Sequence, residues 1–262
     1  MQIISYAQNR EDVLLSRALS QVGQGFYIDV GANDPEKDSV TKTFYDRGWR
    51  GINVEPLPAV MKRLEQERPR DKNLRVLVGD NEATVDFFEI PEDDRLSTMD
   101  AQIARGHVKT LGYSMRKSQL RMTTLSRICE ENRVEEVHFV KIDVEGHETE
   151  VLRGLDLHRW RPWILLIEST LPYSQVDASF SWEHLVTNAG YKCVFFDGLS
   201  KFFLAQEHGD LAEYFATPPN VFDGFVSSCE ISLRKELEQL KKSPRLLCRA
   251  LVNALRARLR RA

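Results

Sequence analysis

The densest group of polar residues in this sequence is the stretch VKIDVEGHE, residues 140–148. An apolar run ends there in Asp143, Glu145 and His147, and a helical pattern follows directly. A carboxylate or an imidazole can act as a general base, which a neutral hydroxyl needs because its oxygen is a weak nucleophile. We predict that Glu145 or His147 takes a proton from an acceptor and that Asp143 orients the site. Lys141 is expected to point away from Asp143.

A second acid, Glu168, ends the apolar run WILLIE. Asp143 and Glu168 could together hold a divalent cation such as Mg²⁺, because carboxylate oxygens are ligands that this ion prefers. The alternative is that Glu168 hydrogen-bonds Ser169, Thr170 or a loop amide. A zinc site is not expected, because the six histidines show no ligand spacing.

The stretch FYIDVGANDP, residues 26–35, places the carboxylate of Asp29 inside an apolar run. Gly31 lets the backbone approach a ligand closely, and Asn33 tolerates a left-handed conformation. Asp29 could order this loop and face a cationic amine. The alternative is an ordinary turn after a strand, with Asp29 as a cap.

Two further polar groups follow later apolar runs. Glu55 ends GINVE, 26 residues after Asp29, near the spacing at which an acid binds ribose hydroxyls in nucleotide-binding folds. Asp80 or Asn81, in VGDN, could accept a hydrogen bond from an adenine amino group. A solvated acid at the strand end and a simple turn are the alternatives for these two positions.

The charges in the turn after residues 26–30 indicate which kind of nucleotide cofactor could bind. The dinucleotide motif GxGxxG is absent, because Pro35 and Glu36 stand where a third glycine is needed. Asp29, Asp34, Glu36 and Asp38 crowd this turn, which suits a ligand with positive charge. S-adenosylmethionine carries a sulfonium and an ammonium group. It is therefore the predicted cofactor.

The elements that must position these residues are strands alternating with helices, which indicates a parallel sheet. We expect strands at residues 26–30, 51–55, 74–78, 137–142, 163–168, 191–196 and 201–205. We expect helices at residues 9–20, 37–47, 58–67, 123–132, 147–154 and 181–189. The polar groups would then converge at the carboxyl ends of neighbouring strands, where open α/β sheets bind ligands.

Two segments depart from this alternation. Residues 84–88, TVDFF, have the period of an added antiparallel strand. Residues 91–121 are rich in polar and basic residues, and loops of this length are usually functional, so we interpret them as an insertion on the substrate side. We predict one domain over residues 1–228 and a helical tail over residues 229–262.

The composition is that of an ordinary globular protein, with 262 residues, 42% apolar and 29% charged. No run approaches 18 apolar residues, so no membrane span is predicted. The first 15 residues do not resemble a signal peptide. Four cysteines without CxxC spacing fit a reducing compartment, and we expect a cytoplasmic protein.

Charge is concentrated at the end of the chain. Residues 241–262 hold eight basic residues and no acid; since the net charge is −3, residues 1–240 sum to −11. Such an acidic body disfavours nucleic-acid binding. In the tail, leucines recur at helical spacing beside arginines, at positions 247, 251, 255 and 259, as in a basic amphipathic helix. This helix would lie peripherally on the inner face of a membrane, contact a partner protein or second copy, or fold back on the body.

Six stretches, in the same order, resemble the FkbM family of S-adenosylmethionine-dependent methyltransferases. They are SYAQNREDVLL (5–15), GFYIDVGANDP (25–35), WRGINVEPLP (49–58), LSTMD (96–100), MTTLSRICEE (122–131) and FVKIDVEGHETEVLRG (139–154). The last is the most specific. The resemblance implies a Rossmann-like, seven-stranded class I methyltransferase sheet, mostly parallel with one antiparallel strand. It also implies methyl transfer to an oxygen, often of a sugar or natural product.

The resemblance also implies roles for individual residues. The methionine part of the cofactor would contact Asp29, Gly31, Ala32 and Asn33, the ribose Glu55, and the adenine side Asp80 and Asn81. Asp143 would border both cofactor and acceptor. Ser97 and Thr98 would line the acceptor pocket. Gln8 and Asp12 are the candidates for closing over the cofactor.

We therefore predict an S-adenosylmethionine-dependent O-methyltransferase that acts on a sugar hydroxyl of a glycan or glycosylated product, in glycan biosynthesis. One alternative is a catalytically degenerate methyltransferase fold that only binds a glycan or a partner. Another is a nucleotide-dependent oxidoreductase, which the missing GxGxxG disfavours. The sequence predicts no oligomeric state.

Overall fold

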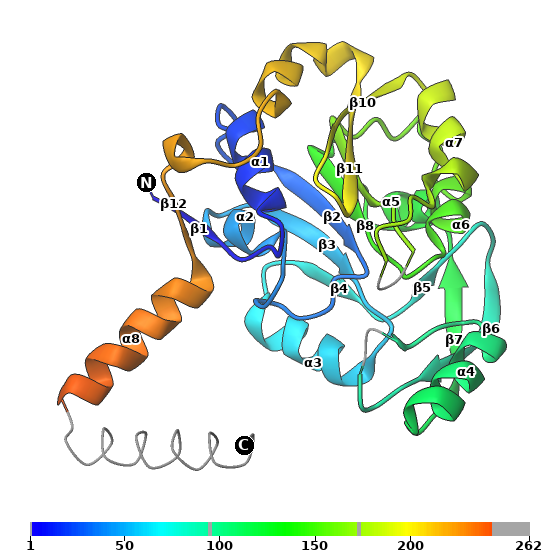
Figure 1. Ribbon diagram of the computed structural model, residues 1–262. Coiled ribbons are helices and arrows are strands. Elements are labelled where there is room, and N and C mark those ends of the chain that lie inside the picture. The colour runs from blue at the N-terminus through cyan, green and yellow to red at the C-terminus, as the bar shows by residue number, and fades with distance from the viewer. Residues whose placement is uncertain (1, 94–95, 172–173, 243–262) are drawn as a thin grey trace.

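The computed structural model describes residues 2–93, 96–171 and 174–242. Its centre is a seven-stranded sheet with strand order β10-β11-β9-β8-β2-β3-β4 (Figure 1). The strands are β2 (Phe26–Val30), β3 (Arg50–Val54), β4 (Lys72–Leu74), β8 (Phe139–Ile142), β9 (Ile164–Glu168), β10 (Tyr191–Phe196) and β11 (Ser200–Ala205). Within this sheet, β11 alone runs in the direction opposite to the other strands. The predicted sheet, mostly parallel with one antiparallel strand, is confirmed.

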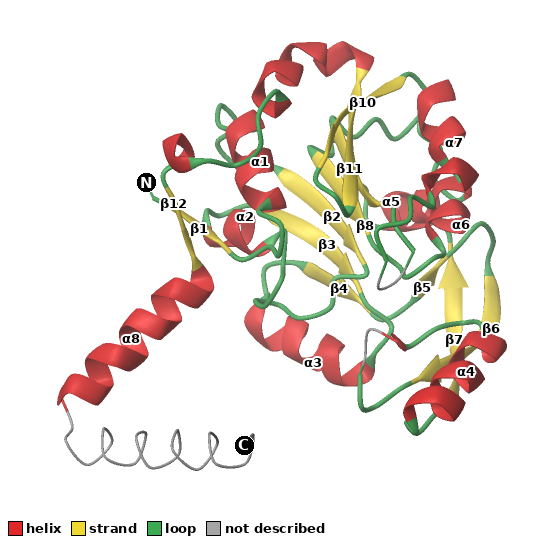
Figure 2. Cartoon of the chain, viewed as in Figure 1, coloured by secondary structure: helices red, strands yellow, loops and turns green. Residues whose placement is uncertain are grey.

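Helices cover both faces of the sheet (Figure 2). The α-helices around the sheet are α1 (Glu11–Ala18), α2 (Lys42–Asp46), α3 (Pro58–Glu67), α5 (Leu125–Glu131), α6 (Glu148–Arg153) and α7 (Glu183–Asn188). The chain also forms the 3₁₀ segments η2 (Ser179–Ser181), η3 (Gln206–Phe215) and η4 (Val221–Asp223). Side chains of α5, α6 and α7 form one core with the sheet, whereas α1, α2 and η3 form a second core on the other face. Burial on both faces explains why strands such as β8 and β9 are mostly apolar.

The strand expected at residues 74–78 is two strands, so this prediction is wrong. β4 ends at Leu74, and β5 (Leu77–Val78) leaves for a separate sheet of order β5-β7-β6, with β6 (Ala83–Glu89) and β7 (Arg116–Thr123). Leu77 packs there with Phe87 and Leu120, and this small apolar core accounts for the split. β6 is antiparallel, as predicted, but it pairs with β7 outside the central sheet.

Two other segments differ from expectation. The segment 91–121, read as a loop, contains α4 (Ala101–Leu111), whose first amides donate to the Asp100 carboxylate, and most of β7. The helix expected at 37–47 begins only at Lys42. Asp38 is left-handed, with φ 59°, and Asp34 accepts hydrogen bonds from two amides of the preceding turn, so the chain is not helical there.

A strand near the N-terminus pairs with a strand that precedes the last described helix. β1 (Ile3–Ser5) pairs in parallel with β12 (Phe225–Ser227), and α8 (Ser228–Lys242) then leads away from the body with no buried residue (Figure 1). Residues 243–262, which hold most of the predicted basic amphipathic helix, lie outside the described residues, so its membrane or partner contact stays a prediction. In the described ranges, no helix has the length and apolar character needed to cross a membrane.

Candidate functional site

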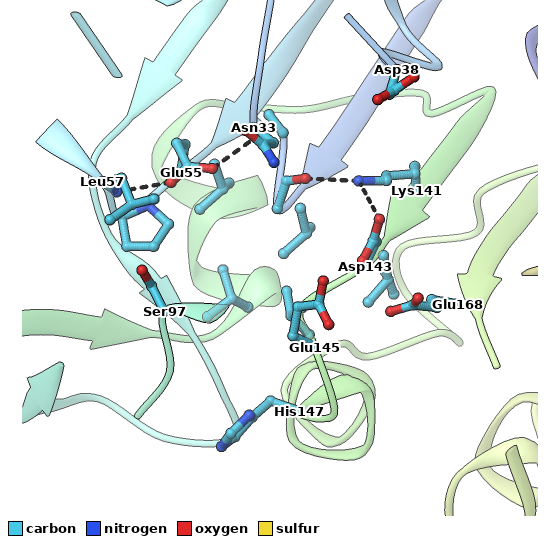
Figure 3. Close-up of a pocket in the computed structure, with 18 of the residues that line it drawn as sticks. Asn33, Asp38, Glu55, Leu57, Ser97, Lys141, Asp143, Glu145, His147 and Glu168 are labelled. Atoms are coloured by element: carbon cyan, nitrogen blue, oxygen red, sulfur yellow. Dashed lines mark hydrogen bonds and ion pairs between the residues drawn. The ribbon is translucent and has the colours of Figure 1, made fainter. Parts of the chain in front are cut away.

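A cavity of about 550 Å³ lies at the carboxyl ends of β2, β3 and β8, close to the end of β9 (Figure 3). Most of the predicted site residues line it: Gly31, Ala32, Asn33, Glu55, Ser97, Thr98, Asp143, Glu145, His147 and Glu168. These residues come from separate strand ends and from the insertion. The topology therefore brings together groups that are up to 137 positions apart in the chain.

The loop after β2 is fixed against its two neighbouring strands. The amides of Gly31 and Ala32 both donate to the carbonyl of Val54 on β3, at 3.0 and 3.1 Å. Gly31 is left-handed, with φ 77°, and a Cβ there would lie 1.9 Å from the carbonyl oxygen of Asp143. Asn33 is also left-handed, with φ 47°. Only glycine fits at position 31, because both its conformation and its contact with β8 exclude a side chain.

Glu55 is held at the end of β3 by backbone amides. It is 4% exposed; one carboxylate oxygen accepts from the amide of Asn33 at 3.0 Å and the other from the amide of Leu57 at 2.8 Å (Figure 3). Burial raises the pKa of Glu55 to about 7. Each carboxylate oxygen can accept two hydrogen bonds, so Glu55 keeps acceptor capacity toward the cavity that it lines.

Asp29 lies beneath the loop and does not border the cavity. Its side chain is buried, its Oδ2 accepts from the hydroxyl of Thr41 at 2.8 Å, and its Oδ1 lies 3.5 Å from Nζ of Lys141. The structure therefore places Asp29 as a support for the loop. It does not bring this carboxylate to the surface on which the cofactor's amine was expected.

Asp80 and Asn81 also lie outside the lining of the cavity. Both are exposed, and the amide of Asn81 donates to the carboxylate of Asp80 at 3.0 Å. The cavity is bordered on this side by apolar residues, among them Leu77 and Phe87. The predicted contact of residues 80 and 81 with adenine rested on a strand at 74–78. Because β5 leaves the central sheet, the turn after it does not reach the cavity.

Carboxylates gather at the ends of β8 and β9. Figure 3 shows Glu145 pointing toward Asp143 and Glu168, whereas the ring of His147 points away from them. Burial, together with the neighbouring charge of Asp143, raises the pKa of Glu168 to about 10, and Glu168 hydrogen-bonds Asp143. Glu168 therefore keeps its proton at neutral pH.

This arrangement gives the predicted divalent cation no support. Among the described residues, no three or more His, Cys, Asp or Glu side chains are grouped so that they could hold a metal ion. The alternative stated for Glu168, a hydrogen bond within the protein, is the one observed, although its partner is Asp143.

A tight turn in VEGHE brings Glu145 to the cavity, whereas Glu148 braces the turn from inside. The buried carboxylate of Glu148 accepts from the amides of Val144 and Gly146, at 3.1 Å each. Glu145 and Gly146 are both left-handed, with φ 53° and 96°. Glu148 thus holds a strained turn in place, and this acid was not singled out from the sequence.

Lys141 lies next to Asp143, so the expectation that it points away is wrong. Its Nζ donates to the carbonyl of Gly31 at 2.7 Å and lies 3.2 Å from Oδ2 of Asp143. Side chains alternate along a strand, so residues 141 and 143 share a face. Burial alone would lower the pKa of Lys141, but Asp143 and Asp29 outweigh it and raise the pKa above its usual range. The signal that could have indicated this role is the lysine inside an otherwise apolar strand.

The side of the cavity predicted to take the acceptor is lined by Ser97 and Thr98. Thr98 is paired through its backbone with Phe88 of β6, and the hydroxyl of Ser97 accepts from the amide of Ile90 at 3.0 Å. From the N-terminal segment, Gln8 and Glu11 line the cavity. Asp12 does not: it is buried and accepts from the hydroxyl of Ser5 and the amides of residues 6 and 7. Of the two candidates for closing over the cofactor, only Gln8 reaches the cavity.

The strand order, the single antiparallel strand and the cavity at the carboxyl ends define a class I methyltransferase fold. Residues 29–193, more than half of the chain, match the methyltransferase FkbM domain. The chain therefore belongs to the FkbM methyltransferase family, and its general activity is methyl transfer.

Solved structures give only distant likenesses. A TehB-like SAM-dependent methyltransferase from Corynebacterium glutamicum is 10% identical over 74% of this chain and 87% of that one, with a TM-score of 0.39. An O-methyltransferase from Bacillus cereus in complex with SAH is 12% identical over 76% and 80%, with a TM-score of 0.39. A SAM-dependent methyltransferase from Geobacter sulfurreducens is 12% identical over 74% and 68%, with a TM-score of 0.36. A comparison with curated proteins gave no match.

Proposed function

We propose that this methyltransferase uses S-adenosylmethionine and methylates a hydroxyl group, on a sugar of a glycan or glycosylated product. One observation carries the proposal. The carboxylate of Glu55, fixed by two backbone amides after β3, lines the same cavity as Asp143 and Glu145, which follow β8 on the other side of β2. A group for ribose and groups for acid–base chemistry thus share one cavity.

The cofactor half of the cavity fits S-adenosylmethionine. Glu55 would accept from the ribose hydroxyls, and the backbone of residues 31–33 would contact the methionine part. The apolar residues Leu77 and Phe87 would pack on the adenine. When bound, the cofactor supplies a methyl group on a sulfonium, whose positive charge suits the carboxylates of Asp143 and Glu145.

The acids at the end of β8 would handle the proton of the acceptor. Glu168 is protonated at neutral pH and Asp143 is engaged by Lys141 and Glu168, so neither is placed to take a further proton. Glu145 points into the cavity (Figure 3) and in its carboxylate form would accept the hydroxyl proton. The methyl group then passes from sulfur to that oxygen and leaves S-adenosylhomocysteine. His147 is the second candidate for the base.

The acceptor side supports a polyhydroxylated substrate. Gln8, Ser97, Thr98 and Ser200 line it, and their amide or hydroxyl groups both donate and accept hydrogen bonds, as sugar hydroxyls do. A natural-product acceptor that carries a sugar satisfies the same groups. Localisation in the cytoplasm and a role in glycan biosynthesis remain parts of this proposal.

Calorimetry tests the cofactor and separates the alternatives. We expect the protein to bind S-adenosylhomocysteine and not NAD. Binding of NAD alone would favour an oxidoreductase. Binding of S-adenosylhomocysteine without methyl transfer to any of a panel of sugar glycosides, measured by release of S-adenosylhomocysteine from the methyl donor, would favour a binding module.

A further inference from the structure

Lys141 occupies the point where the strand ends of the cavity meet. It is 13% exposed, and its Nζ lies 2.7 Å from the carbonyl oxygen of Gly31, 3.2 Å from Oδ2 of Asp143 and 3.5 Å from Oδ1 of Asp29. These partners belong to the loop after β2, the end of β8 and the end of β2. One ammonium group thus lies against three separate parts of the site, and Figure 3 shows its contacts with the loop after β2 and with Asp143.

We propose that Lys141 is a positioning residue for methyl transfer, which fixes the loop for the cofactor and the Asp143 carboxylate in one geometry. This inference rests on the proposed function. Lys141 needs no contact with the cofactor or acceptor to act in this way. Its effect passes through the carbonyl of Gly31 and through Asp143.

The charges around the amine show why its own charge matters. The carboxyl groups of Asp143, Asp29 and Glu168 raise the pKa of Lys141. The positive charge of Lys141 in turn opposes the rise in the pKa of Glu55. Asp29 is buried, and no hydrogen bond reaches its Oδ1, so Lys141 is the cation that compensates this oxygen. Without it, Asp29 and Asp143 would be like charges at adjoining strand ends, which repel each other.

The backbone contact makes the loop sensitive to this pairing. The Cα of Gly31 faces the carbonyl of Asp143 so closely that no Cβ fits between them. A shift of Asp143 away from a lost cation therefore displaces the loop, and with it the amide of Asn33 that donates to Glu55. Lys141 thus connects the acceptor side of the cavity to the group proposed for the ribose.

The chain offers a matched control in Lys201. It is 12% exposed, lies in β11 of the same sheet, and pairs with two acids, Asp177 and Glu183, at 3.0 and 2.8 Å. Lys201 does not line the cavity. K141M and K201M therefore remove the same charge at similar burial, and only K141M removes it from the site.

The experiment measures S-adenosylhomocysteine binding by calorimetry, with folding checked by circular dichroism. We expect K141M to weaken binding at least about tenfold, since a buried charge pair and a hydrogen bond are lost, and K201M to stay within about twofold of wild type. Equal changes in both variants would overturn the proposal. If wild type itself does not bind, the proposed function fails instead.

A chemical rescue separates positioning from general structure and remains decisive if K141M does not fold. K141A leaves room for an added alkylammonium, and we expect propylammonium to restore most of the lost affinity. Propan-1-ol has a similar size but no charge, and it should restore none. No rescue by either compound, or equal rescue by both, would overturn the assignment to the ammonium group.

Discussion

The two halves of the cavity are built differently. On the half proposed for the cofactor, here called the cofactor half, backbone amides and carbonyls hold the site: Glu55 accepts from two amides, and two amides of the loop after β2 donate to Val54. On the half proposed for the acceptor, here called the acceptor half, side chains contact one another, as in the series Lys141, Asp143 and Glu168. The first half is fixed by the fold, whereas the second depends on which groups carry protons.

The largest effect is expected where the two halves touch. In G31A, the new Cβ would overlap the carbonyl of Asp143 in a left-handed backbone. We expect loss of detectable S-adenosylhomocysteine binding and a destabilisation of about 2–4 kcal/mol, measured by calorimetry and denaturant unfolding. G23A is the control, because nothing lies within 4 Å of its Cβ. Normal binding by G31A would show that the loop is not fixed.

The next effect concerns the acceptor half alone. E145Q should lower the rate of methyl transfer by about 10²–10⁴ and leave S-adenosylhomocysteine binding within about twofold, because only the proton acceptor is lost. H147A is compared in the same assay. A larger loss in H147A than in E145Q would transfer the role of base to His147. Wild-type rates in both variants would show that neither Glu145 nor His147 is the base.

A smaller effect is expected on the cofactor half. E55A should weaken S-adenosylhomocysteine binding by about 1–3 kcal/mol, because hydrogen bonds to the ribose are lost. Calorimetry measures this change, and E67A on the exposed face of α3 is the control. An unchanged dissociation constant in E55A would take Glu55 out of the cofactor site.

The smallest effect tests the proton on Glu168. A carboxyl group whose pKa is raised by folding stabilises the folded state at low pH, and this stabilisation is lost as pH rises from about 4.5 through about 10. E168Q keeps a neutral donor toward Asp143. We expect it to be more stable than wild type at pH 8 and equally stable near pH 4. Urea unfolding at both values measures this; a less stable E168Q at pH 8 would show an ionised Glu168.

The sequence predicted the central sheet well, because strands buried on both faces are marked by apolar runs and by turn residues between them. Glycines at positions 48 and 190 end helices in left-handed conformations, as their spacing indicates. It also predicted which strand ends carry polar groups. These features depend on neighbours in the chain, which the sequence displays directly.

Pairing between distant segments was not predictable in this way. The break between β4 and β5 depends on Leu77 pairing with Met122, and the position of Asp80 follows from that break. Two polar side chains of the site were also misjudged. Asp29 supports the loop from below, and Lys141 shares a face with Asp143, because both roles depend on the register of β2 and β8.

The central claim is that the acids at the strand ends form one site for an adenosine-bearing methyl donor. A crystal structure with S-adenosylhomocysteine tests it most directly. We predict ribose hydroxyls within hydrogen-bonding distance of Glu55 and the sulfur facing Asp143 and Glu145. The ligand bound elsewhere, or an empty cavity at saturating ligand, would contradict the account.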